Sequence, residues 1–146
     1  MSCIRNFVSF VVFTLIIFCI PQLVLAGESG TYESVSSFVH DYTKFDFADK
    51  KIISGPLHGT DTITKSSGGP FVLGESSVFV CAVYVKKSDA GMDLEAPCAT
   101  TDSSGDVTYV IARRRAGDTE TGGGGEGRQE IVGGTGKYAG ITGSCT

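Results

Sequence analysis

Apolar and polar residues alternate along most of the chain after residue 37, with the period of two that indicates β-strands. The clearest run is "ESSVFVCAVYVKKSD" at 75–89, whose alternate residues are apolar on both faces. One face would carry Val78, Val80, Ala82 and Tyr84, and the other Phe79, Cys81, Val83 and Val85. Because both faces are apolar, we expect this strand to be central and largely buried.

The segment before this strand predicts shorter strands separated by breaks. "FVHDYTKFDF" at 38–47 alternates and places Phe45 and Phe47 on one face, and Asp49-Lys50 is expected to turn the chain. Gly55-Pro56 predicts a second break before "LHGTDTITK" at 57–65, and "SSGGP" at 66–70 predicts a loop. Residues 27–37 are polar and are expected to be irregular.

Two further strands are predicted after residue 100. They are "VTYVIARRR" at 107–115, which follows a "DSSGD" turn, and "RQEIV" at 128–132, which follows a glycine-rich loop. No segment after residue 26 has convincing helical periodicity, and we expect at most one short helical turn. The fold class is therefore all-β, an antiparallel barrel or sandwich, in one domain over residues 27–146.

Residues 1–26 have the pattern of a secretory signal peptide. Arg5 supplies a short positive region, residues 7–20 are almost wholly apolar, and Ala26 ends a segment suited to signal peptidase. Fourteen or so apolar residues are too few for a typical membrane span of about 20. The sequence therefore predicts an exported protein, periplasmic or extracellular, with no membrane attachment after cleavage.

Charge and cysteine content narrow the classes of partner. The net charge is −4, and the signal segment holds one of twelve basic residues and none of the sixteen acidic ones. The chain is acidic, and its one basic run is residues 113–115. On a strand these side chains would alternate between the two faces and form no basic patch, which argues against nucleic-acid binding. No Cys/His spacing indicates a metal site, and no cofactor is expected.

Three cysteines follow the signal segment, and export permits disulfides. Cys81 and Cys98 are the natural pair, closing a short loop worth about 3 kcal/mol on the chain-entropy model. Cys145 is left over and is expected to be free, to pair between chains, or to lack a partner beyond Thr146.

The glycines near the end of the chain formally match a dinucleotide fingerprint but lack its context. Gly122, Gly124 and Gly127 fit the pattern, as do Gly134, Gly136 and Ala139. The motif needs a helix after its glycines, whereas a strand pattern follows the first window and "GITGSC" the second. We therefore interpret Gly133, Gly134, Gly136 and Gly143 as a structural corner between two strands.

This corner, "EIVGGTGKYAGITGS" at 130–144, resembles the "I-x-GGTGK-[FY]-x-x-x-x-G" signature of the allene oxide cyclase and dirigent group of β-barrels. The chain after the signal also resembles small exported bacterial proteins of unknown activity that carry "VYVKKSDAGMDLEAPC", "GGGGEGR" and "GGTGKYAGITGSC". The resemblance implies an eight-stranded antiparallel barrel. Six or seven strands are identifiable here, so we expect the barrel to be incomplete at its C-terminus, with an open edge.

The resemblance also implies that any chemistry takes place inside the barrel. Inward Asp, Arg and Tyr side chains are used in that group, and the weak catalytic candidates here are Asp46, Tyr84, Tyr109 and Arg114. None can be matched to a family site residue, and each is more simply a core, rim or strand-end residue.

Two functions stay open on the sequence alone. The first is non-catalytic binding of a small apolar ligand or an envelope component, and the alternative is a cofactor-free isomerase, cyclase or dirigent-like protein acting on a hydrophobic substrate. A homo-oligomer formed through the open edge or Cys145 is a further possibility.

Overall fold

The computed structural model describes residues 29–117 and 127–146, and there it confirms the all-β prediction. Eight strands form one antiparallel sheet. They are β1 (Tyr32–His40), β2 (Thr43–Phe47), β3 (Lys50–Ser66), β4 (Ser76–Ser88), β5 (Gly91–Asp102), β6 (Val107–Arg114), β7 (Arg128–Gly134) and β8 (Gly143–Cys145). The one helical element in these ranges is a single 3-10 turn, η1 (Gly136–Tyr138).

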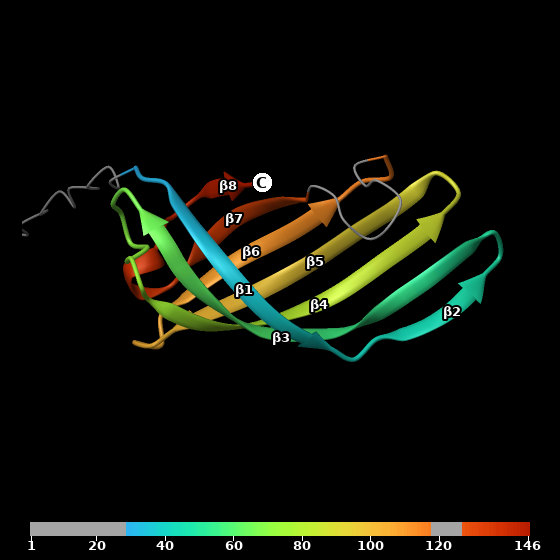
Figure 1. The fold of residues 1–146 in the computed structure, drawn as a ribbon, viewed down its shortest axis with the longest axis horizontal. Helices are drawn as coiled ribbons and strands as arrows, with labels where there is room; N and C mark the ends of the chain where they lie inside the picture. The colour runs from blue at the N-terminus through green and yellow to red at the C-terminus, as the bar shows by residue number, and fades with distance from the viewer. Residues whose placement is uncertain (1–28, 118–126) are drawn as a thin grey trace, which may run out of the picture.

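The sheet curls into an open barrel (Figure 1). Its order is β1-β3-β4-β5-β6-β7-β8, with β2 paired to the other end of β3. The edge strands β1 and β8 share no backbone ladder, but the Cys145 thiol donates a hydrogen bond to the Tyr32 hydroxyl at 3.3 Å. The two edges therefore approach each other at one end of the barrel and leave a seam along the rest.

The chain becomes regular earlier than the sequence predicts. Residues 32–37 are part of β1, so the expectation of an irregular segment up to residue 37 is wrong. Tyr32 is opposite Ser66, and the Ser36 hydroxyl donates to the Asp61 carboxylate at 2.7 Å. This polar segment is a strand because β3 supplies its backbone and side-chain partners.

The predicted break at Gly55-Pro56 is also wrong, because β3 runs through it without interruption. On one side β3 pairs first with β2 and then with β1, and these two residues fall between the partners, after Thr43↔Ser54 and before His40↔Leu57. Pro56 has no N–H to lose there, and its carbonyl accepts a hydrogen bond from the Asp41 backbone at 3.1 Å. The proline therefore occupies the one stretch of β3 where the neighbouring strand changes.

Strand β4 is central, as predicted, but only one of its faces is buried. Cys81, Val83 and Val85 face the concave side and are buried, whereas Val78 is 59% exposed and Tyr84 is 47% exposed. In a single curled sheet the concave face is covered by the opposite side of the same sheet, whereas nothing in the described residues covers the convex face. The expectation that both faces of this strand are buried is therefore wrong.

The corner after β7 has the predicted form of strand, tight turn and strand. Gly136 has a φ of +51°, and the next strand begins at Gly143. A Cβ on Gly134 would meet the Tyr138 side chain and the Val107 carbonyl. No α-helix follows the second glycine window, whose residues 134–139 are described, so the element that a dinucleotide site needs is missing there.

The predicted signal peptide, residues 1–26, and the glycines at 122–125 lie outside the described residues. Among the residues that are described, no helix is long and apolar enough to cross a membrane.

Candidate ligand-binding cavity

The concave side of the sheet encloses a cavity of about 310 Å³. Successive side chains of a strand point to opposite faces, so alternate residues of each strand reach this space. Strand β4 contributes Phe79, Cys81 and Val83, and β5 contributes Leu94, Ala96, Cys98, Thr100 and Asp102. The volume is at the lower end of the range typical of small-molecule sites.

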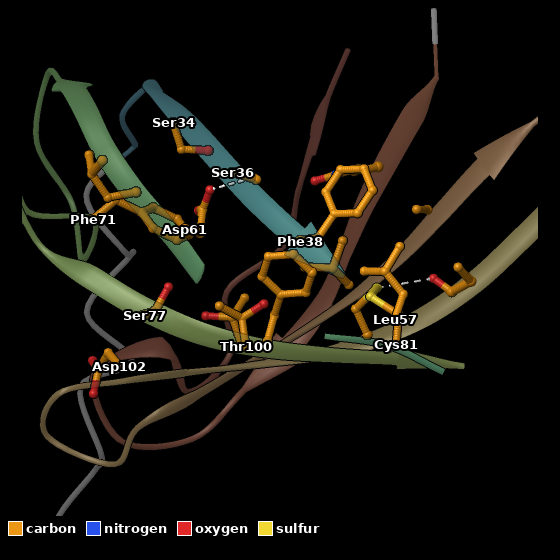
Figure 2. Close-up of a pocket in the computed structure, with 18 of the residues that line it drawn as sticks. Ser34, Ser36, Phe38, Leu57, Asp61, Phe71, Ser77, Cys81, Thr100 and Asp102 are labelled. Carbon is orange, nitrogen blue, oxygen red and sulfur yellow. Dashed lines mark hydrogen bonds between the residues drawn. A yellow bond between two sulfur atoms is a disulfide. The ribbon is translucent and has the colours of Figure 1, made fainter. Parts of the chain in front are cut away.

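The strand register sorts the inward side chains into rows that run across the sheet. Ser36 is opposite Asp61, Asp61 is opposite Ser77, and Ser77 is opposite Asp102. We call these four residues the polar row. Figure 2 shows Ser36, Asp61, Ser77 and Asp102 on one side of the cavity, with Leu57 and Cys81 on the other.

The next rows are apolar and aromatic. Phe38 is opposite Gly59, which is opposite Phe79. A Cβ on Gly59 would overlap the Phe79 ring and the Ser37 carbonyl, so glycine is needed there for the ring to lie inside the barrel. Leu57, Val83 and Leu94 line the part of the cavity beyond these rings.

The predicted disulfide is confirmed and forms part of the cavity wall. Cys81 and Cys98 are directly opposite on β4 and β5, with Cα atoms 4.1 Å apart. Both cysteines line the cavity. The bond joins the two strands at the middle of the sheet.

An ionic cluster closes the polar end of the barrel. The Lys137 ammonium lies 2.6 Å from Glu75 Oε1 and 2.8 Å from Asp102 Oδ2. The side chain of Asp102 is 1% exposed, and its Oδ1 accepts hydrogen bonds from the Ser104 backbone and hydroxyl and from the Asp106 backbone. Lys137 therefore ties the glycine corner to β5 and to the start of β4.

The charges in this cluster hold one another in their ionised forms. The Lys137 ammonium holds the pKa of the Asp102 carboxyl well below its usual range, against the effect of burial. Burial on its own would lower the pKa of Lys137, but contacts with Asp102 and Glu75 outweigh it and raise that pKa.

Three aromatic side chains lie beside the cluster. The Tyr32 and Phe71 rings stack with centroids 4.0 Å apart, and Phe71 lies 5.4 Å from Tyr138. Burial raises the pKa of Tyr138 to about 12, and burial together with the Cys145 hydrogen bond raises the pKa of Tyr32. Both phenols therefore keep their protons at neutral pH.

Asp61 differs from the other carboxylates of the cavity. Its Oδ1 accepts the Ser36 hydroxyl at 2.7 Å, and no other hydrogen bond or ion pair reaches its side chain from residues 29–117 or 127–146. Glu75 and Asp102 share an ammonium, but Asp61 has none. Among the carboxylates that line the cavity, Asp61 is the one that no cation of the described residues contacts.

The four catalytic candidates from the sequence do not line the cavity, and the structure does not bring them together. Asp46 is exposed on β2 and lies 3.7 Å from Lys51. Tyr84 and Tyr109 are exposed on the convex face, where Tyr84 is opposite Glu95 and Tyr109 opposite Ala99. Arg114 ends β6 opposite Leu94.

Sequence reasoning missed Asp61, Asp102 and Lys137 as cavity-end residues. The alternation in 57–65 places Leu57, Gly59 and Asp61 on one face, so an inward Asp61 was within reach of the pattern. The sequence predicts a turn that begins at Asp102 and a corner that contains Lys137, and both predictions are right for the backbone. The contact between Asp102 and Lys137 joins segments far apart in the sequence, so no local sequence pattern predicts it.

No group of three or more potential metal ligands occurs among the described residues, and His40 stacks on Tyr42 at 4.3 Å. No family model, curated protein or solved structure matches the chain. The likeness to the allene oxide cyclase and dirigent group therefore stays a prediction from the corner sequence.

Proposed function

We propose that this is an exported, non-catalytic protein that binds a small apolar molecule in the cavity of its open barrel. The observation that carries the proposal is the lining of the cavity, where the row of Phe38 and Phe79 and the apolar side chains beyond it lie next to the polar row. A mostly apolar cavity with a few polar groups at one end is the usual form of a small-molecule site.

The solvent exposure of Phe38, an apolar residue that lines the cavity, supports the proposal that a ligand occupies the cavity. Phe38 lines the space but is 57% exposed, because it lies on the edge strand β1. An apolar ligand would cover this ring and contact Leu57 and Leu94, gaining about 25 cal/mol for each Å² of apolar surface removed from water.

Two further features support the remaining parts of the proposal. The Cys81–Cys98 disulfide suits an oxidising compartment outside the cytoplasm. The scattered positions of Asp46, Tyr84, Tyr109 and Arg114 favour binding over catalysis.

The test compares two alanine-to-phenylalanine substitutions on opposite faces. Ala112 lines the cavity and Ala99 lies on the convex face. We expect octanol to bind the wild type in calorimetry, Ala112→Phe to lose that binding by filling the space, and Ala99→Phe to retain it. Equal octanol binding by all three proteins, or binding lost only in Ala99→Phe, would refute the cavity as the site.

Native mass spectrometry of protein recovered from its own cells without reductant gives a second readout. A constant small adduct that disappears in Ala112→Phe would supply the natural ligand for identification. Absence of both an adduct and octanol binding would contradict the proposed function.

A further inference from the structure

We propose that the ligand is a small organic cation, an amine with an apolar body, and that Asp61 binds its ammonium group. This inference rests on the proposed function, because it names the chemical class of the molecule in the cavity. Its basis is the charge, the row geometry and the aromatic side chains at the polar end.

The charge of the cavity is unbalanced. Among residues 29–117 and 127–146, three carboxylates line it, those of Asp61, Glu75 and Asp102, and no lysine, arginine or histidine does. Lys137 is the one cation that contacts this set among the described residues, and it lies between Glu75 and Asp102. A low-dielectric hollow with excess negative charge concentrates the field and favours a cationic guest.

Asp61 lies where a ligand head would reach it. It belongs to the polar row, one row away from Phe38 and Phe79 on the neighbouring strands. In Figure 2 the Asp61 carboxylate points into the cavity and is joined to Ser36 by a hydrogen bond. An ammonium group at this position would bind Asp61, with the apolar body over the phenyl rings toward Leu57.

The hydroxyls around Asp61 suit an ammonium, which carries three donors and no acceptor. Ser77 lies directly opposite Asp61, and Ser34 lies two residues before Ser36 on β1. Both line the cavity, and each hydroxyl oxygen can accept a hydrogen bond. The cost of moving a charged head out of water is therefore offset by a carboxylate and by neutral acceptors.

Aromatic rings add a second attraction for a cation. Tyr32 and Phe71 line the same cavity as Asp61, and their rings are stacked together. Ring faces within about 6 Å of a cation attract it through their quadrupole. A carboxylate beside aromatic rings is a combination that favours organic cations over anions and neutral molecules.

The same arrangement disfavours a carboxylate ligand such as a fatty acid. A second negative charge beside Asp61 would be repelled, and the ammonium of Lys137 is already held by Glu75 and Asp102. The preference for a head group can therefore be measured by comparing ligands that share the same apolar chain and differ only in the head group.

The experiment measures the affinities of octylamine, octanol and octanoate for the wild-type protein at neutral pH by calorimetry. We expect octylamine to bind about tenfold tighter than octanol or better, since hydrogen bonds to a charged group add that much. Octanoate should bind more weakly than octanol.

Two variants with the same charge change assign the preference to Asp61. Asp61→Asn keeps the shape of the side chain and an oxygen that can accept the Ser36 hydrogen bond. We expect this variant to bind octanol as tightly as the wild type does, and to bind octylamine no more tightly than octanol. Asp89→Asn, in the exposed turn between β4 and β5, should keep the tenfold preference.

The outcomes separate this inference from the proposed function. Octanol binding with no preference for the amine, or a preference that survives Asp61→Asn, overturns the cation site and leaves apolar binding intact. Failure of all three ligands to bind overturns both.

Discussion

At the scale of single residues, two aspartates of the polar row differ in their hydrogen-bond and ion-pair partners, and this difference determines what each side chain can do. Asp61 and Asp102 both border Ser77 across the sheet. Asp102 is surrounded by donors from its own turn and by Lys137, so its charge is satisfied inside the fold. Asp61 has one hydroxyl donor. Asp102 therefore contributes to stability, whereas Asp61 is the group to which we assign the proposed ligand.

Replacing Lys137 with methionine tests the role of Asp102. Because the pKa of Asp102 is lowered by folding, its ionised form contributes stability above about pH 4, which is lost as the pH falls toward the lowered value. We expect the melting temperature of Lys137→Met at pH 7 to be at least about 5 °C below that of the wild type. The difference from the wild type should shrink below about pH 4, as Asp102 takes up a proton in the variant.

Lys87→Met on β4 is the matched control, because Lys87 is exposed and none of the described residues pairs with its charge. Its melting temperature should stay near that of the wild type across the same pH range. A gap between Lys137→Met and the wild type that is constant with pH would contradict the ion pair as the source of stability.

At the scale of elements, the glycine corner shapes the polar end of the barrel. It carries Lys137 to the ion pair with Asp102 and places Tyr138 against Phe71. The Thr135 backbone donates to the Val107 carbonyl at 2.7 Å, and the Thr135 hydroxyl accepts from the Val107 backbone at 2.8 Å. The corner thus continues the contact between β6 and β7 past the end of the strands.

Substituting Gly134 with valine is expected to destabilise the protein by about 3 kcal/mol, as a side chain forced into a filled space. Its Cβ would meet both the Tyr138 side chain and the Val107 carbonyl, and backbone cannot move aside cheaply. Urea unfolding measures the effect.

Gly143→Val at the start of β8 serves as the control, because a Cβ there meets only Ile131 Cδ1 at 3.5 Å. We expect it to unfold near the wild-type urea concentration. Equal midpoints for the Gly134 variant and the wild type would show that the corner tolerates a side chain.

At the scale of the whole molecule, the barrel is held by a strong centre and two weak edges. The buried cluster around Cys81, Val83, Val85 and Ala96 lies on β4 and β5, which are paired on both sides. Most residues of β1 are exposed, and β8 is three residues long. The seam between β1 and β8 is where these two weak edges meet, through the hydrogen bond from Cys145 to Tyr32.

Amide hydrogen exchange should follow this gradient. Val85 is paired with both Ile53 and Leu94, whereas β1 is paired on one side. We expect the amide of Val85 to exchange more than about tenfold slower than the edge-facing amides of β1. Slow exchange along all of β1 would mean that something covers this edge.

The sequence by itself was enough to determine the strand class, the Cys81–Cys98 pair and the strand–corner–strand form of the end. Those features depend on alternation, on cysteine spacing and on glycine geometry, which are local. Residues 32–37 and Gly55-Pro56 were misread, because local composition opposes strands there and only β3 and its changing neighbours supply the hydrogen bonds.

Only the tertiary structure decided which face of β4 is covered and which polar groups meet. Curling the sheet gives it an inside, so Val83 is buried while Tyr84 beside it is exposed. The register across β1, β3, β4 and β5 brings Ser36, Asp61, Ser77 and Asp102 from four separate segments into one row. Such rows are set by the pairing of whole strands, and that pairing cannot be recovered from any one strand's own pattern.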